Sequence, residues 1–186
     1  MKKIVVFASG SGTNFQKIAD ELHHSVCDIA MLICDKPGAY CIERAKKLNI
    51  PTFVFNPKEY ENKAAFETDI ITTLSDIDPD LIVLAGYMRI IGSTLLDKYE
   101  GRIINIHPAL LPAFPGAHGI EDAYNYGVKI MGVSVHYVDA GIDTGKIIDQ
   151  DCFKRTGGET LEEIETKIHE LEYEIYPRVI KQLLST

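Results

Sequence analysis

Asn105 and His107 stand two positions apart and could carry out acyl-transfer chemistry together. They fall in the short apolar segment 103–108, which is typical of a buried strand. Residues i and i+2 of a strand point to the same side, so the two side chains project together. An amide can donate a hydrogen bond to an oxyanion, and an imidazole can carry a proton near neutral pH. The pair therefore suits attack of an amine on a carbonyl carbon.

A carboxylate that could serve this pair follows in a second segment. Gly141 and Gly145 imply an irregular backbone that holds Asp143 in a tight loop. A carboxylate beside His107 would favour the charged imidazole. Two alternatives stay open from the residues alone: Asp143 could bond its own backbone in a turn, and His107 could be a structural histidine.

A glycine-rich loop spans residues 9–14, between a predicted strand and a predicted helix. A helix N-terminus offers unpaired N–H groups to an anion, and glycines let the backbone approach a ligand closely. Thr13 and Asn14 add side-chain donors. We predict a monophosphate site at this loop.

Other interpretations of the loop are weaker but stay open. It has no Gly-Lys-Ser/Thr sequence and is therefore not a Walker A motif. Gly10 and Gly12 fit a dinucleotide fingerprint, but Phe15 occupies the third glycine position. Asp35, after the second predicted strand, could still contact a ribose. The remaining alternative is a tight turn that binds nothing.

The pattern of apolar residues predicts an α/β fold. Expected strands cover residues 4–8, 28–34, 52–55, 81–85 and 102–106. Expected helices cover residues 15–22, 42–48, 63–75 and 95–99. This alternation predicts a mostly parallel twisted sheet with helices on both faces. The carboxyl edge of such a sheet, where Asn105 and His107 would lie, is where ligands bind.

The pattern changes after residue 107. Prolines and glycines predict a loop over 108–119, followed by strands at 131–138 and 146–153. Thr160 and Glu163 form a capping-box signature for a last helix, which Pro177 should kink or end. We find no linker and expect residues 1–186 to form a single domain.

Composition narrows the function classes. The chain has 186 residues and a formal net charge of -8, which argues against nucleic acid as a partner. The four cysteines form no CxxC pair, and we expect them to be reduced in a cytoplasmic protein. No apolar run is long enough for a membrane span. The histidines lack metal-ligand spacing, so we expect no metal.

Several segments together resemble the folate-dependent formyltransferase family. The matching stretches run from Phe7 to Asn14, Leu84 to Ile90, Asn105 to Pro112, His136 to Val138 and Asp143 to Gly145. Their order and spacing match along nearly the whole chain. The resemblance implies a Rossmann-like formyltransferase fold, with phosphate-substrate binding in the N-terminal half and with folate binding and catalysis in the C-terminal half.

The resemblance also implies an activity and its residues. The implied reaction transfers the formyl group of 10-formyltetrahydrofolate to the amine of phosphoribosylglycinamide in purine biosynthesis, without a metal. Asn105 would hold the formyl oxygen, protonated His107 would stabilise the oxyanion, and Asp143 would keep His107 charged. Residues implied in phosphate and ribose binding are Gly12, Thr13, Asn14, Gly86 and Glu172. Residues implied in folate binding are Lys63, Met88, Arg89, Ile90, Ile91, Asn105 and Val138.

The chain departs from the family pattern at three positions. Ile120 stands where relatives often have histidine, Lys146 replaces a usual proline, and Lys63 stands where some relatives have arginine. The nearest rival activity is hydrolysis of formyltetrahydrofolate. Its enzymes carry an N-terminal regulatory domain, which we do not expect because the first strand begins at residue 4. An initiator-tRNA formyltransferase would need a C-terminal extension, which we do not expect either.

Two hypotheses from other functional classes stay open: the protein could be a dinucleotide-dependent oxidoreductase, or a phosphate-binding module without catalytic activity. Under the formyltransferase reading the partners are small molecules, and the protein is a monomer or homodimer.

Overall fold

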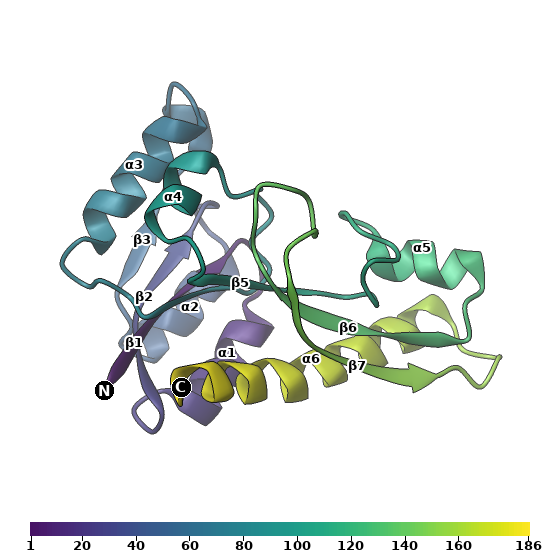
Figure 1. Ribbon diagram of the computed structural model, residues 1–186. Helices are drawn as coiled ribbons and strands as arrows, with labels where there is room; N and C mark the ends of the chain where they lie inside the picture. The colour runs from purple at the N-terminus through teal and green to yellow at the C-terminus, as the bar shows by residue number, and fades with distance from the viewer.

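A computed structural model describes residues 1–186, which build one seven-stranded sheet covered by helices on both faces (Figure 1). The strands are β1 (Lys2–Ala8), β2 (Cys27–Cys34), β3 (Thr52–Val54), β4 (Leu81–Leu84), β5 (Ile103–His107), β6 (Ile130–Tyr137) and β7 (Ile147–Lys154). Their spatial order is β3-β2-β1-β4-β5-β6-β7. Strands β1 to β5 pair in parallel, whereas β6 and β7 join antiparallel. The predicted fold class is confirmed.

The helices follow the strands as the alternation predicts. They are α1 (Thr13–Leu22), α2 (Tyr40–Lys47), α3 (Lys63–Leu74), α4 (Ser93–Lys98), α5 (Gly119–Tyr126) and α6 (Leu161–Leu184), with a short 3-10 turn, η1 (Pro57–Glu59). The capping box that begins α6 is present: the Thr160 side chain accepts from the backbone N–H of Glu163, and the Glu163 side chain accepts from the N–H of Thr160.

Two cores explain why β1 is an unbroken apolar run. Ile4 and Val6 face a core built with α1 and α6, while Val5 and Phe7 face a second core built with α3 and α4. All four side chains are fully buried. A strand covered on both faces needs apolar residues at every position rather than at alternate ones.

The order of the strands decides where a site can form. The chain runs outward from β1 through β2 to β3, then returns to place β4 on the other side of β1. Ligands of open α/β sheets bind at such a reversal, beyond the carboxyl ends of the strands. The segments that leave β1, β4 and β5 therefore meet at one edge.

Two features differ from the sequence-based expectation. Of the two outcomes predicted at Pro177, a kink or an end of the helix, the end does not occur, because α6 continues to Leu184. Apolar residues on both sides of Pro177, such as Ile175 and Val179, are fully buried, and this packing outweighs the backbone hydrogen bond that a proline lacks. Helix α5 was not predicted, because its buried residues are only Gly119 and Ala123, too few for a recognisable apolar stripe.

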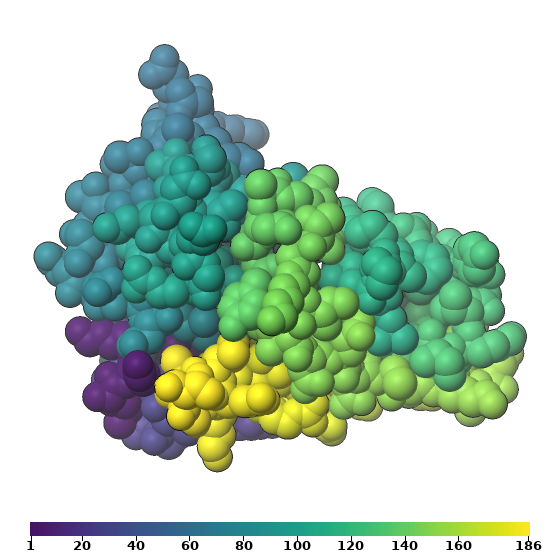
Figure 2. Space-filling view, viewed as in Figure 1, coloured from purple at the N-terminus to yellow at the C-terminus, as the bar shows by residue number.

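None of the helices combines the length and the apolar character that a membrane crossing demands. The loop between β6 and β7, bright green in Figure 2, stands beside the teal segment that includes α4. The cavity described below opens where this loop approaches the segment that follows β4.

Candidate active site

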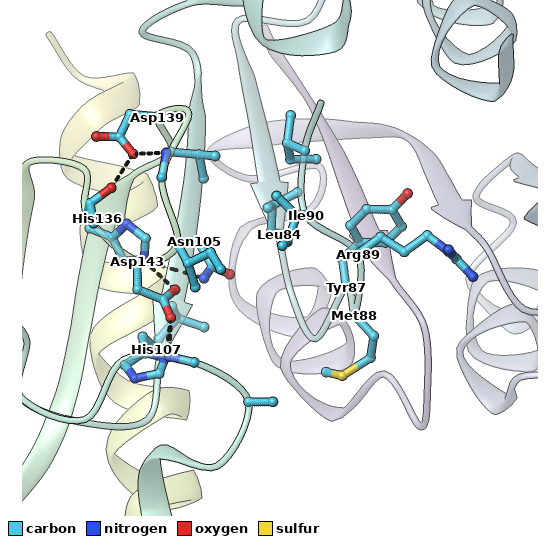
Figure 3. Close-up of a pocket in the computed structure, with 18 of the residues that line it drawn as sticks. Leu84, Tyr87, Met88, Arg89, Ile90, Asn105, His107, His136, Asp139 and Asp143 are labelled. Atoms are coloured by element: carbon cyan, nitrogen blue, oxygen red, sulfur yellow. Dashed lines mark hydrogen bonds and ion pairs between the residues drawn. The ribbon is translucent and has the colours of Figure 1, made fainter. Parts of the chain in front are cut away.

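The carboxylate of Asp143 lies between two imidazoles (Figure 3). One oxygen, Oδ2, is 3.5 Å from Nδ1 of His107, and the other, Oδ1, is 3.6 Å from Nε2 of His136. The Asn105 amide nitrogen is 3.4 Å from the same His136 nitrogen. The three residues predicted for catalysis are thus brought together, with His136 as a fourth member.

The backbone around Asp143 is held in an unusual shape. Asp143 itself has φ of 53°, a left-handed conformation that costs energy for a residue with a side chain. Asp139 braces the loop, because its carboxylate accepts hydrogen bonds from the Thr144 hydroxyl at 2.6 Å and from the Gly141 N–H at 3.0 Å. These two bonds, the Thr144 bond first, lower the pKa of Asp139. At Gly145 the carbonyl of Tyr137 occupies the place of a Cβ, so only glycine fits.

The loop 108–118 contributes backbone groups to the same cluster. The N–H of Gly116 donates to Oδ2 of Asp143 at 2.8 Å, and the carbonyl of Phe114 lies 2.7 Å from Nε2 of His107. Both ring nitrogens of His107 therefore face acceptors. A doubly protonated ring satisfies both contacts, since it carries a donor on each nitrogen.

His136 is a candidate functional residue that the sequence reasoning did not select. Its Nδ1 lies 2.8 Å from the carbonyl of Tyr137, which assigns a proton to Nδ1. Its Nε2 is left to face Asn105 and Asp143. His136 lies beside Asn105 because the two residues are paired across the antiparallel strands β5 and β6. Antiparallel pairing of these strands could not be read from their spacing.

A cavity of about 440 Å³ opens in front of this cluster. One wall is the segment 86–91 that follows β4, and the opposite wall is the loop around Asp143 (Figure 3). Of the residues predicted to bind folate, the cavity is lined by Met88, Arg89, Ile90, Ile91, Asn105 and Val138. Gly86 lines it too. Lys63 does not line it; its ammonium donates to the carbonyl of Ile90 at 2.8 Å and so supports the wall from outside.

The glycine loop lies at the same edge of the sheet. Gly12 has φ of 75°, and a Cβ there would collide with Cys41, so the turn into α1 requires glycine. The first N–H groups of a helix have no partner within the helix and point out of its N-terminus. The loop touches the cavity wall directly, because the N–H of Ser9 donates to the carbonyl of Gly86 at 3.0 Å.

Asn14 and Glu172, far apart in the sequence, meet beside this loop. The Asn14 amide donates to Oε2 of Glu172 at 3.1 Å, and Glu172 is only 6% exposed. His169, one turn earlier in α6, places Nδ1 at 2.9 Å from the same oxygen. The sequence reasoning did not select His169, although its i,i+3 spacing from Glu172 on a helix could have indicated the contact.

The structure argues against the dinucleotide interpretation, in which the Asp35 carboxylate would contact a ribose. Both oxygens of the Asp35 carboxylate are occupied, one by the Ser9 hydroxyl and the other by Arg89 at 2.8 Å. Phe15, at the third glycine position, is fully buried in the core.

Comparison with known proteins agrees with this geometry. The sequence pattern of the formyl transferase family matches residues 2–180. Phosphoribosylglycinamide formyltransferase of Bacillus subtilis is 56% identical, covering 99% of this chain and 95% of that protein. The solved structure of glycinamide ribonucleotide transformylase 1 from Geobacillus kaustophilus has a TM-score of 0.95 at 54% identity, with 99% of each chain covered. Phosphoribosylglycinamide formyltransferase from Streptococcus pneumoniae gives a TM-score of 0.93 at 51% identity, covering 98% of this chain and 99% of that one.

The chain belongs to the formyl transferase family. The resemblance inferred from the sequence motifs is thereby confirmed, and so is the Rossmann-like formyltransferase fold.

Two departures from the formyl transferase pattern lie outside the cluster around Asp143. Ile120 packs against the larger core rather than lining the cavity. Lys146 is exposed, and its carbonyl accepts from the N–H of Tyr137 at 2.9 Å, so the strand pairing beside the loop is kept. With Lys146 in place of the usual proline, the loop still places Asp143 against His107.

The contact between His169 and Glu172 predicts a measurable titration. The hydrogen bond that the His169 ring donates to Glu172, aided by the charge of that carboxylate, raises the pKa of His169 above its ordinary value of 6.5. The interaction is therefore complete below that value and is lost as the pH rises through the raised pKa. We expect an NMR titration of the His169 ring to show the raised pKa, and Glu172→Gln to bring it back toward 6.5. An equal pKa in both proteins would contradict the contact.

Proposed function

We propose that this protein transfers the formyl group of 10-formyltetrahydrofolate to the amine of N1-(5-phosphoribosyl)glycinamide, in the pathway of de novo purine biosynthesis. The observation that carries the proposal is the grouping of Asn105, His107 and Asp143 at the mouth of a cavity beside a glycine loop. Relatives aligned over nearly the whole chain bear the name of this transferase, which supports the same reaction.

The residues of the cluster suit direct acyl transfer. The substrate amine attacks the formyl carbon, and a tetrahedral intermediate forms with a negative oxygen. The Asn105 amide and protonated His107 are placed to stabilise that oxygen. The intermediate collapses when the bond from carbon to the folate N10 breaks, N10 takes up a proton, and the formylated amine has lost one.

Asp143 governs the charge of His107 in this mechanism. Its carboxylate favours the imidazolium form, and it can accept the amine's proton through water. The separations of 3.5 Å and 3.6 Å exceed normal hydrogen bonds, and contacts of this kind tighten when substrate binds. For His107 to donate to the substrate, one of its present contacts, to Phe114 or to Asp143, must be exchanged.

The two substrates would enter from different sides of the cluster. The phosphate would bind at the N-terminus of α1, where Gly12, Thr13 and Asn14 offer donors, with Glu172 beside the ribose. Gly86 lies between this loop and the cavity. The folate would occupy the cavity along the 86–91 wall, with Val138 opposite.

Further features support the setting of the reaction. All four cysteines are free, which agrees with a reducing cytoplasm. Helix α6 packs on α1 and also on β6 and β7, so the two halves of the sheet share one support (Figure 1). We therefore propose that residues 1–186 act as a single domain.

The deciding assay follows the release of tetrahydrofolate from 10-formyltetrahydrofolate. We expect release only when phosphoribosylglycinamide is present, with one formylated product formed for each tetrahydrofolate. Release at the same rate without the amine would show a hydrolase instead. Tight binding of NAD in place of either substrate would favour the oxidoreductase reading.

A second prediction concerns the phosphate site. Replacement of both Thr13 and Asn14 by Ala removes two donors, so we expect the KM for phosphoribosylglycinamide to rise by about a hundredfold or more, at roughly 1.5–3 kcal/mol for each lost hydrogen bond to a charged group. The KM for the folate donor should change little. Ser25→Ala, an exposed residue just beyond the other end of α1 whose hydroxyl donates to the carbonyl of Glu21, is the matched control. An unchanged KM in the double variant would remove these residues from the site.

A further inference from the structure

Asp35 is a buried carboxylate that the proposed reaction does not use. It follows β2 directly, and only 7% of the residue is exposed. It does not line the cavity. A buried charge is costly unless it is paired and hydrogen-bonded, so its contacts indicate what it does.

Both Asp35 oxygens are committed to groups that reach the cavity wall. Oδ1 accepts from the hydroxyl of Ser9, and Oδ2 accepts from Nε of Arg89 at 2.8 Å. The Ser9 hydroxyl donates its hydrogen to Asp35, so the Ser9 oxygen can act as an acceptor. The N–H of Met88 donates to this oxygen at 2.9 Å. Two consecutive residues of the wall are thus held by one carboxylate, one directly and one through Ser9.

The middle of the wall, from Met88 to Ile90, has little packing of its own, although its ends are packed: Tyr87 lies edge-on to Phe7, and Ile91 is buried. Met88 is 77% exposed and Ile90 is 52% exposed. The wall leaves β4 at Gly86, whose φ of 77° turns the chain sharply. Polar contacts from outside must therefore fix this exposed middle: Asp35 supplies those at Met88 and Arg89, and Lys63 donates to the carbonyl of Ile90.

The direction of the Arg89 side chain follows from the same contact. Figure 3 shows its guanidinium pointing away from the cluster of Asn105, His107 and Asp143. The ion pair with Asp35 and the ring of Phe66, 6.0 Å from the guanidinium carbon, hold it there. Without the contact to Asp35, the Arg89 guanidinium can rotate into the cavity and occupy the volume in which the folate would bind.

We propose that Asp35 is a positioning residue for the formyl-donor site, which it shapes by holding the 86–91 wall through Ser9 and Arg89. This inference rests on the proposed function. It concerns binding of the folate donor rather than the chemical step, since Asp35 touches neither the cluster nor the cavity.

The test compares two variants that perturb the network differently. Asp35→Asn keeps the size of the side chain and one acceptor but loses the ion pair with Arg89. Ser9→Ala keeps that ion pair and removes the acceptor for the N–H of Met88. For each we expect the KM for 10-formyltetrahydrofolate to rise by about tenfold, the effect of one lost charge-assisted or buried hydrogen bond. In Asp35→Asn, which lies outside the glycine loop, the KM for phosphoribosylglycinamide and kcat should stay within about twofold of wild type.

Asp80→Asn is the matched control. Asp80 also accepts a backbone N–H, from Lys3, and pairs with Lys2, but it lies before β4, at the other end of that strand. It should leave both KM values unchanged. Thermal unfolding of all three variants separates a loss of stability from a change of the wall.

The outcomes are distinct. A KM for the donor within twofold of wild type in both variants overturns the proposal. So does an equal rise of both KM values in Asp35→Asn together with a lowered unfolding midpoint, which marks a structural role. If the wild type shows no turnover, the proposed function fails first. Calorimetric titration with tetrahydrofolate then decides: weaker binding to Asp35→Asn than to wild type supports the inference, and equal or absent binding overturns it.

Discussion

The site depends on one carboxylate shared between two imidazoles. Asp143 can hold this position only because several groups converge on it: the N–H of Gly116, the braced turn around Asp139, and a glycine at 145 where no other residue fits. The left-handed backbone at Asp143 is strained, and strain of this kind persists only where the surroundings hold it. The fold supplies those surroundings by bringing the loops after β5 and β6 together.

Strand order turns this local arrangement into a place where two substrates can meet. The strand order reverses between β1 and β4, and this reversal places the glycine loop beside the cavity wall. Asn105 and His107 lie next to both because β5 pairs with β4. The antiparallel return through β6 and β7 then carries the Asp143 loop back over the end of β5. A parallel sheet alone would leave the imidazole without its carboxylate.

Much of the fold and part of the site could be predicted from the sequence, and the features that could not be predicted have physical reasons. Continuous apolar runs identify β1 and β4, because strands buried on both faces must be apolar throughout. The i,i+2 spacing places Asn105 beside His107. Side-chain patterns say nothing of backbone donors and acceptors, so the roles of Phe114 and Gly116 could not be predicted. His136 was missed because its position depends on cross-strand register, which no local pattern sets.

The most direct test of the central contact is a double-mutant cycle on His107 and Asp143, read as kcat in the formyl-transfer assay. If the carboxylate acts through the imidazole, His107→Ala and Asp143→Ala should each lower kcat by about a thousandfold, and the double variant should be little worse than either. Thermal unfolding should confirm that all three variants remain folded. Losses that multiply in the double variant, or near-normal turnover in either single one, would contradict the account.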